Sequence, residues 1–125
     1  MKLLIPLLLA LAPTVARADK VYLHVGKGNI WDCAIDPVIY IRHGNGHFVF
    51  KGACKAVTIE AGKVRLSIES VETLAVNGNN NDVTVGILDT LTINGSDNMV
   101  RYKTAKSGDV KSDAQGTGNT LLHIR

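Results

Sequence analysis

One short block recurs along this chain, and this periodicity restricts the fold more than any other feature. The segment 74–90 reads LAVNGNNNDVTVGILDT, and the next, 91–107, reads LTINGSDNMVRYKTAKS. Leu, Asn, Gly, Asn and Val coincide at the first, fourth, fifth, eighth and tenth places. Blocks that begin at 21, 39 and 57 keep the same order of apolar and polar residues, and a looser one begins at 110. A repeat of this length indicates stacked structural units.

Each block contains an apolar-x-apolar triplet, a turn rich in Gly and Asn, and a second such triplet. Alternation with a period of two is typical of β-strands, and Gly and Asn interrupt the chain too often for a helical stripe. One block cannot bury its own apolar side chains, but parallel strands stacked above one another can. The sequence therefore predicts an all-β fold, a short parallel β-solenoid of about five to six coils with 17–18 residues per coil.

Alignment of the blocks predicts columns of inward-facing side chains along the solenoid axis. The turn amides are expected to stack too, Asn77 with Asn94 and Asn81 with Asn98, and to hydrogen-bond along the axis. An antiparallel sandwich is the alternative fold, but it does not require identical residues at a fixed spacing. The predicted columns are Val21, Ile39, Val57, Leu74, Leu91 and Val110; Leu23, Ile41, Ile59, Val76 and Ile93; Ile30, Phe48, Leu66, Val83, Val100 and Leu121; Phe50, Ile68, Val85 and Tyr102; and Ile35, Ala53, Val71 and Leu88.

Residues 1–18 have the pattern of a secretory signal peptide. Lys2 precedes an apolar run over 3–12, and the Ala-Arg-Ala of 16–18 places small residues where a signal peptidase cleaves. The run is too short to cross a hydrocarbon core of ~30 Å as a helix. We therefore expect a signal peptide at 1–18, a β-solenoid domain at 19–125, and a periplasmic or secreted protein without a membrane span after cleavage.

Cys33 and Cys54 are the only cysteines of the chain, and an oxidising compartment favours a disulfide between them. Without residues 1–18 the chain carries 12 basic and 11 acidic side chains, so its net charge is near +1. This balance argues against a nucleic-acid partner, because affinity for phosphate needs a concentrated cationic patch.

Three segments, NGNNNDVTV, NGSDNMVRY and GTGNTLLHI, resemble the G-[NS]-x-N-x-V repeats of the DUF3060 family, whose members are typically short exported bacterial proteins of unassigned function. The resemblance covers roughly residues 39–125 and is best from Leu74 onward. It implies the repeat fold and export, and it brings no catalytic residue with it.

Outward positions carry the candidate binding residues, because inward positions are committed to packing. Tyr22 is expected to stack with Tyr40, and Trp31 with Val49, all of them facing outward. Exposed aromatic side chains of this kind contact glycans or proteins. With Arg42 at the rim, we predict a binding face of Tyr22, Trp31, Tyr40 and Arg42.

Acidic residues form an alternative candidate, a hydrolase or lyase site. Glu72 and Asp89 hold the same place in successive blocks and are expected to stack on neighbouring coils, with Asp36 at the same place in the first block. A solvated acidic surface is the favoured interpretation, since no cluster of Arg or Lys accompanies the acids in the sequence.

Histidines are the candidate metal ligands. His43 and His47 flank a Gly-Asn-Gly turn, and His24 lies in the corresponding turn of the first block. No carboxylate completes a familiar zinc motif, and we predict neither a metal ion nor a cofactor nor a catalytic residue.

These features predict an exported, non-catalytic binding module of the periplasm or cell envelope, with an envelope protein or a glycan as its partner. An inhibitor or an immunity-type partner of a toxin or hydrolase is one form of this role. Two alternatives stay open: a small carbohydrate-active enzyme that uses the stacked carboxylates, and a structural solenoid that self-associates through its coil ends. Unpaired strand edges make such ends adhesive unless they are capped, and segments 103–109 and 111–115 are the expected cap.

Overall fold

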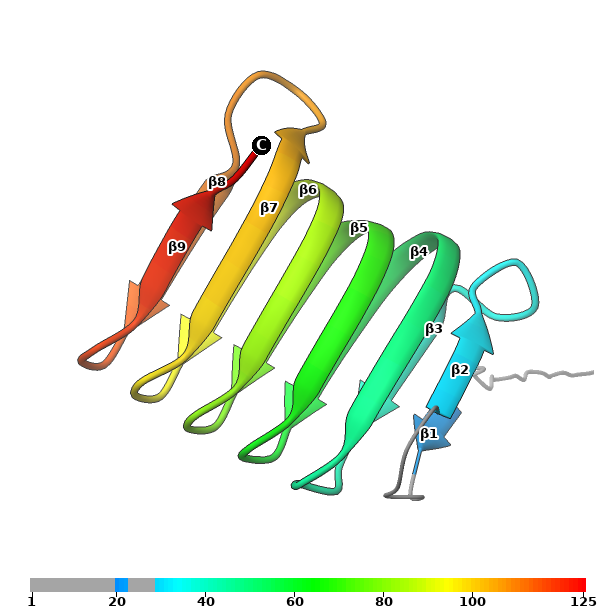
Figure 1. Ribbon diagram of the computed structural model, residues 1–125, viewed down its shortest axis with the longest axis horizontal. Helices are drawn as coiled ribbons and strands as arrows, with labels where there is room; N and C mark the ends of the chain where they lie inside the picture. Colours follow the sequence, from blue (N-terminus) through cyan, green and yellow to red (C-terminus); the bar gives the residue numbers. More distant parts are fainter. Residues whose placement is uncertain (1–19, 23–28) are drawn as a thin grey trace, which may run out of the picture.

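The computed structural model describes residues 20–22 and 29–125, where β-strands are the only regular elements. Every strand pairs in parallel, in the order β1-β3-β4-β5-β6-β7-β9, with β2 on β4 and β8 on β6. The predicted all-β parallel solenoid is confirmed (Figure 1), whereas the predicted signal peptide and His24 lie outside the described residues. The strands are β1 (Lys20–Tyr22), β2 (Asn29–Asp32), β3 (Val38–Ile41), β4 (His47–Glu60), β5 (Arg65–Asn77), β6 (Asp82–Asn94), β7 (Met99–Ala105), β8 (Lys111–Gln115) and β9 (Thr120–His123).

The solenoid has two long sides. Figure 1 shows β4, β5 and β6 each running along one side, bending at one edge, and returning along the other. We call this edge the bend edge and the opposite one, which holds the Gly/Asn turns, the turn edge. The front side consists of β2, residues 47–51, 65–69 and 82–86, β7 and β9, and the back side consists of β1, β3, residues 56–60, 73–77 and 90–94, and β8.

Register between coils is constant in the centre, where Arg65 pairs with Asp82 and Asp82 with Met99. In β4 the offset to β5 shortens by one residue, since Phe50 pairs with Ile68 but Ala53 with Ser70. A β-bulge absorbs the extra residue there, with Gly52 at a φ of 82°. The apolar side chains on both sides of the bulge therefore keep pointing into the core.

The predicted columns form the core through the central coils. Their members are almost completely buried, and strand pairing places each one beside its predicted neighbour. The confirmed columns are Ile39, Val57, Leu74 and Leu91; Ile41, Ile59, Val76 and Ile93; Phe48, Leu66, Val83 and Val100; and Phe50, Ile68 and Val85.

The first coil departs from the predicted columns by one residue. Ile30 pairs with Val49 rather than with Phe48, and its side chain is 62% exposed. Trp31 takes the inward place beside Phe50. The offset between β2 and β4 is thus one residue longer than the blocks predict, and such a slip turns every side chain of a strand to the opposite face.

The fifth predicted column is also corrected. Cys54, and not Ala53, lies beside Val71, because the bulge at Gly52 shifts the pairing by one residue. Ile35 lies outside this column, in the turn after β2, and is 71% exposed. The buried column is Cys54, Val71 and Leu88.

The last coil is longer than predicted, since Thr90 pairs with Lys111 and not with Asp109. Ser112 rather than Val110 therefore lies beside Leu91. Segment 111–115 adds a strand to the back side instead of covering the coil end, and all five of its residues are exposed. Nothing else among the described residues pairs with the outer edge of β8, and self-association through coil ends stays a prediction.

Asparagine side chains form a buried ladder along the turn edge. Asn81 and Asn98 are each 1% exposed. The Asn81 Nδ2 donates to Asn98 Oδ1 at 3.0 Å, and the Asn98 Nδ2 donates to Asn119 Oδ1 at 3.1 Å. These Nδ2 groups also donate to the carbonyls of Ala61 and Gly78, so the amides satisfy turn backbone that is shielded from water. The predicted stacking is confirmed, and Asn119 extends it.

A second ladder joins Asn94 Nδ2 to Asn77 Oδ1 at 3.2 Å on the exposed surface. Gly95 lies next to both ladders, with a φ of 144°, and a Cβ at this position would lie 1.8 Å from the carbonyl oxygen of Gly78. Only glycine fits this turn, because the coils approach each other through their backbones.

A disulfide joins Cys33 to Cys54, as predicted, with the two Cα atoms 5.0 Å apart. It connects the turn after β2 to the segment of β4 that follows the bulge. The first coil, whose register differs from that of the others, is therefore held covalently to the second.

Replacement of Asn98 by Ala is expected to lower the free energy of unfolding by about 3 kcal/mol, because it leaves buried donors of Asn81 and a partly buried carbonyl without partners. Urea unfolding followed by circular dichroism measures this loss. Asn94→Ala is the matched control on the exposed ladder, with an expected change within about 0.5 kcal/mol. Equal losses for the two variants would contradict the role assigned to the buried ladder.

The double variant Cys33→Ala/Cys54→Ala is expected to lose about 3 kcal/mol of unfolding free energy, because the unfolded chain gains the freedom of a loop with a sequence separation of 21. Denaturant titration of the oxidised protein, the reduced protein and the double variant measures it. The last two should agree, and an unchanged midpoint in both would refute a stabilising disulfide.

Candidate functional site

The predicted aromatic face is divided between the two sides of the solenoid. Trp31 lies in β2 on the front side, where its half-buried ring packs against the core. Its Nε1 donates to the carbonyl of Asp36 at 3.0 Å. The expectation that Trp31 stacks with Val49 and faces outward is therefore wrong, for the register reason given above.

Tyr40 and Arg42 lie together on the back side. The Arg42 guanidinium carbon is 5.4 Å from the centre of the Tyr40 ring, and Arg42 Nε is 3.0 Å from Glu60 Oε1. Tyr22 pairs through its backbone with Ile41 and not with Tyr40, which corrects the predicted stack, and its side chain lies outside the described part. A binding role for these residues stays a prediction, but Trp31 does not share their face.

The predicted acidic site is assembled only in part. Glu72 and Asp89 are adjacent at the bend edge, as their flanking pairs in β5 and β6 require. A single cation accompanies the acids, since Lys106 Nζ lies 3.7 Å from Glu72 Oε2. Asp36 is elsewhere: it is 5% exposed, and its Oδ1 accepts the Val38 N–H at 3.1 Å, which makes it a turn-stabilising residue.

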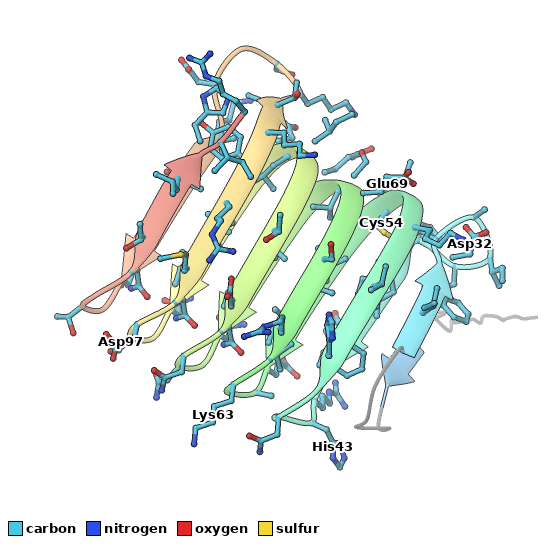
Figure 2. The ribbon with its side chains drawn as sticks, viewed as in Figure 1. Asp32, His43, Cys54, Lys63, Glu69 and Asp97 are labelled. Carbon is cyan, nitrogen blue, oxygen red and sulfur yellow. A yellow bond between two sulfur atoms is a disulfide. The ribbon has the colours of Figure 1, made fainter. Side chains whose placement is uncertain are left out.

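His43 lies exposed in the turn before β4, and His47 begins that strand with its side chain outward. Within residues 20–22 and 29–125, no three His, Cys, Asp or Glu side chains come together as metal ligands. Figure 2 shows His43 on the turn edge, well apart from Glu69 on the bend edge.

A shallow trough on the front side is the candidate site, and the sequence analysis missed it. Its floor is formed by the outward side chains of Ser67 in β5 and Thr84 in β6, with Gly86 toward the bend edge. Two depressions of about 320 and 430 Å³ adjoin here and share Ser67 and Thr84. The signal in the sequence is the small hydroxyl residue inside two apolar triplets, LSI at 66–68 and VTV at 83–85.

The trough is hollow because of the backbone as well as the choice of side chains. A Cβ on Gly86 would lie 2.4 Å from the carbonyl oxygen of Glu69, which is closer than atoms can approach. No side chain therefore fills this place without moving a strand. Lys51 and Lys103, from β4 and β7, border the hollow. The depression is preformed, because the backbone of the neighbouring strand keeps this place empty.

Charged side chains lie at both ends of the trough. Toward the turn edge, Arg101 Nη1 donates to Asp82 Oδ1 at 2.9 Å and to Thr84 Oγ1 at 3.2 Å. Toward the bend edge, Glu69 Oε1 accepts the N–H of Gly52 in the bulge. Both acids thus have partners in the protein.

Among the described residues, most of the cations around the trough lack an ion-pair partner. Three of them, in the part of the chain that the structure describes, form no ion pair. These are Lys51, Arg65 and Lys103, and all three are exposed.

Comparison with known proteins supports the resemblance found in the repeats. The family model described as "Protein of unknown function (DUF3060)" matches residues 65–118. This match is shorter than the expected 39–125, and it contains both residues of the trough floor. No curated protein and no solved structure matches the chain.

Replacement of Gly86 by Ala is expected to cost about 1–3 kcal/mol of unfolding free energy, because the new methyl group forces β5 and β6 to shift. Ser67→Ala is the control, since this exposed side chain can be shortened at a cost within about 0.5 kcal/mol. Urea unfolding compares the two. A Gly86→Ala variant as stable as the Ser67→Ala variant would show that the backbone does not keep the trough open.

Proposed function

We propose that this protein is an exported, non-catalytic binding module that holds an extended ligand in the front-side trough. The observation that carries the proposal is the preformed hollow at Gly86, beside a hydroxyl floor and between charged ends. A site that is already shaped before the ligand arrives avoids the entropic cost of ordering it.

Two features support export. Residues 1–18 have the pattern of a signal peptide, and Cys33 and Cys54 form a disulfide, a bond that persists in oxidising compartments. Over the described ranges, no helix is long and apolar enough to span a bilayer. The proposed location is the periplasm or the cell exterior.

Binding is favoured over catalysis by the partners of the charged groups. Asp82 is held by Arg101, and Glu69 accepts a backbone N–H, so both carboxylates already have partners within the protein. At the bend edge, Glu72 is near Lys106. A general acid or base needs hydrogen-bond reach to the proton that it moves, and these contacts serve the fold instead.

An extended ligand fits the dimensions of the trough. Both depressions are shallow and open to solvent, whereas sites for small molecules enclose most of the ligand. The strand segment from Arg65 to Glu69 spans ~13 Å at the usual rise per residue. Several units of a polymer can therefore contact the floor and both charged ends together.

Replacement of Ser67 by Trp is expected to fill the trough and to weaken binding by about tenfold or more, a loss of roughly 1.4 kcal/mol. The oxidised protein from Asp19 onward is tested by calorimetry against a panel of purified soluble polysaccharides, neutral and acidic. Thr73→Trp is the matched control, because Thr73 is also an exposed residue of β5 but faces outward on the back side. A ligand whose affinity is equal in both variants would refute the trough as the binding site.

A further inference from the structure

We infer that the ligand of the front-side trough is an acidic polysaccharide, a polymer of sugar units that carry carboxylate groups. This inference rests on the proposed function, since it assigns the ligand class of the same site. It depends on the charges at the two ends, on the chemistry of the floor, and on the pairing of the strands beneath it.

The charges favour an anionic ligand. Lys51 and Lys103 border the hollow at Gly86, and Arg65 lies at the other end. Among the described residues these three cations have no ion-pair partner, whereas Asp82 is paired with Arg101, so Glu69 is the one lining carboxylate outside an ion pair and the cations are in excess. The trough therefore presents uncompensated positive charge, and a guanidinium such as that of Arg65 pairs well with a carboxylate through two hydrogen bonds.

Spacing of the cations favours a polymer with repeated anionic groups. Lys51 is in β4 and Lys103 in β7, three strands apart, which corresponds to ~14 Å at the usual distance between strands. Arg65 lies in β5, closer to the turn edge. One small anion cannot reach all three positions, but carboxylates on successive units of one chain can.

Hydroxyl groups on the floor favour a carbohydrate. Ser67 and Thr84 each offer a hydroxyl that donates one hydrogen bond and accepts others. Sugar hydroxyl groups have the same dual character, so they match such a floor. Polar hydroxyl groups thus lie between the charged ends, and the aromatic lining residue Phe50 is only 1% exposed.

Strand pairing disfavours the usual modes of peptide recognition. The floor strands β5 and β6 each have neighbours on both sides, so no edge is open for an added peptide strand. Buried Phe50 offers no aromatic surface for a proline-rich segment. An acidic peptide is the competing ligand that the experiment must separate.

The test compares polygalacturonate with its fully methyl-esterified form, which has the same backbone without the charge. Calorimetry on the oxidised protein from Asp19 onward is expected to show binding to polygalacturonate at low salt, at least tenfold weaker binding to the ester, and weaker binding as NaCl is raised. Lys51→Gln, Arg65→Gln and Lys103→Gln should each weaken binding about three- to tenfold. Lys111→Gln, an exposed strand cation on the back side, is the control and should leave the affinity unchanged.

Four results would overturn the inference. Equal affinity for the acid and the ester would show that charge is not recognised, and the proposed function would survive if Ser67→Trp still blocked binding. Tighter binding of poly-L-glutamate than of polygalacturonate would assign the trough to an acidic peptide. If other panel members bind and polygalacturonate does not bind in the same concentration range, an acidic polysaccharide is excluded as the ligand, but the proposed function survives. Binding of polygalacturonate that Ser67→Trp does not weaken would reject the proposed function as well.

Discussion

Parallel pairing of each coil with the next, in a constant register through the centre, is the constraint on which the rest of this structure depends. The pairing satisfies the backbone and places equivalent side chains beside one another, so an apolar residue in one coil covers its counterpart in the next. No coil has a core of its own. Where the spacing changes, as at Gly52, a bulge restores the inward direction of the side chains within two residues.

The buried asparagine side chains along the turn edge favour one register between neighbouring coils over the others. A buried amide is costly unless its donors and acceptors are paired, and Asn98 is paired only when Asn81 and Asn119 lie directly beside it. A displaced coil would lose these hydrogen bonds as well as apolar contacts. The ladder therefore penalises wrong registers that apolar columns alone would tolerate, since Leu, Ile and Val replace one another at modest cost.

The candidate site is a product of the same stacking. Ser67, Thr84 and the bordering lysines come from four different coils, and none of these segments forms a hollow by itself. Gly86 is required by the backbone of the neighbouring coil, so the shape of the trough is tied to the packing of the solenoid. A rigid scaffold that holds its ligand groups in place is well suited to recognition of an extended polymer.

The sequence by itself determined the parallel solenoid, most of the inward columns, the stacked asparagines and the disulfide, because a fixed period leaves the chain few other ways to bury its apolar residues. Only the tertiary structure decided the alignment of the first coil, which turned Trp31 inward, and the neighbours of the outward side chains. The physical reason is that residues at inward positions must be apolar to be buried, so the repeat of apolar residues in the sequence reveals which positions face inward. Outward contacts depend instead on the offset between paired strands, which is longer at both ends of the solenoid than in its centre, and a difference of one residue reverses a face.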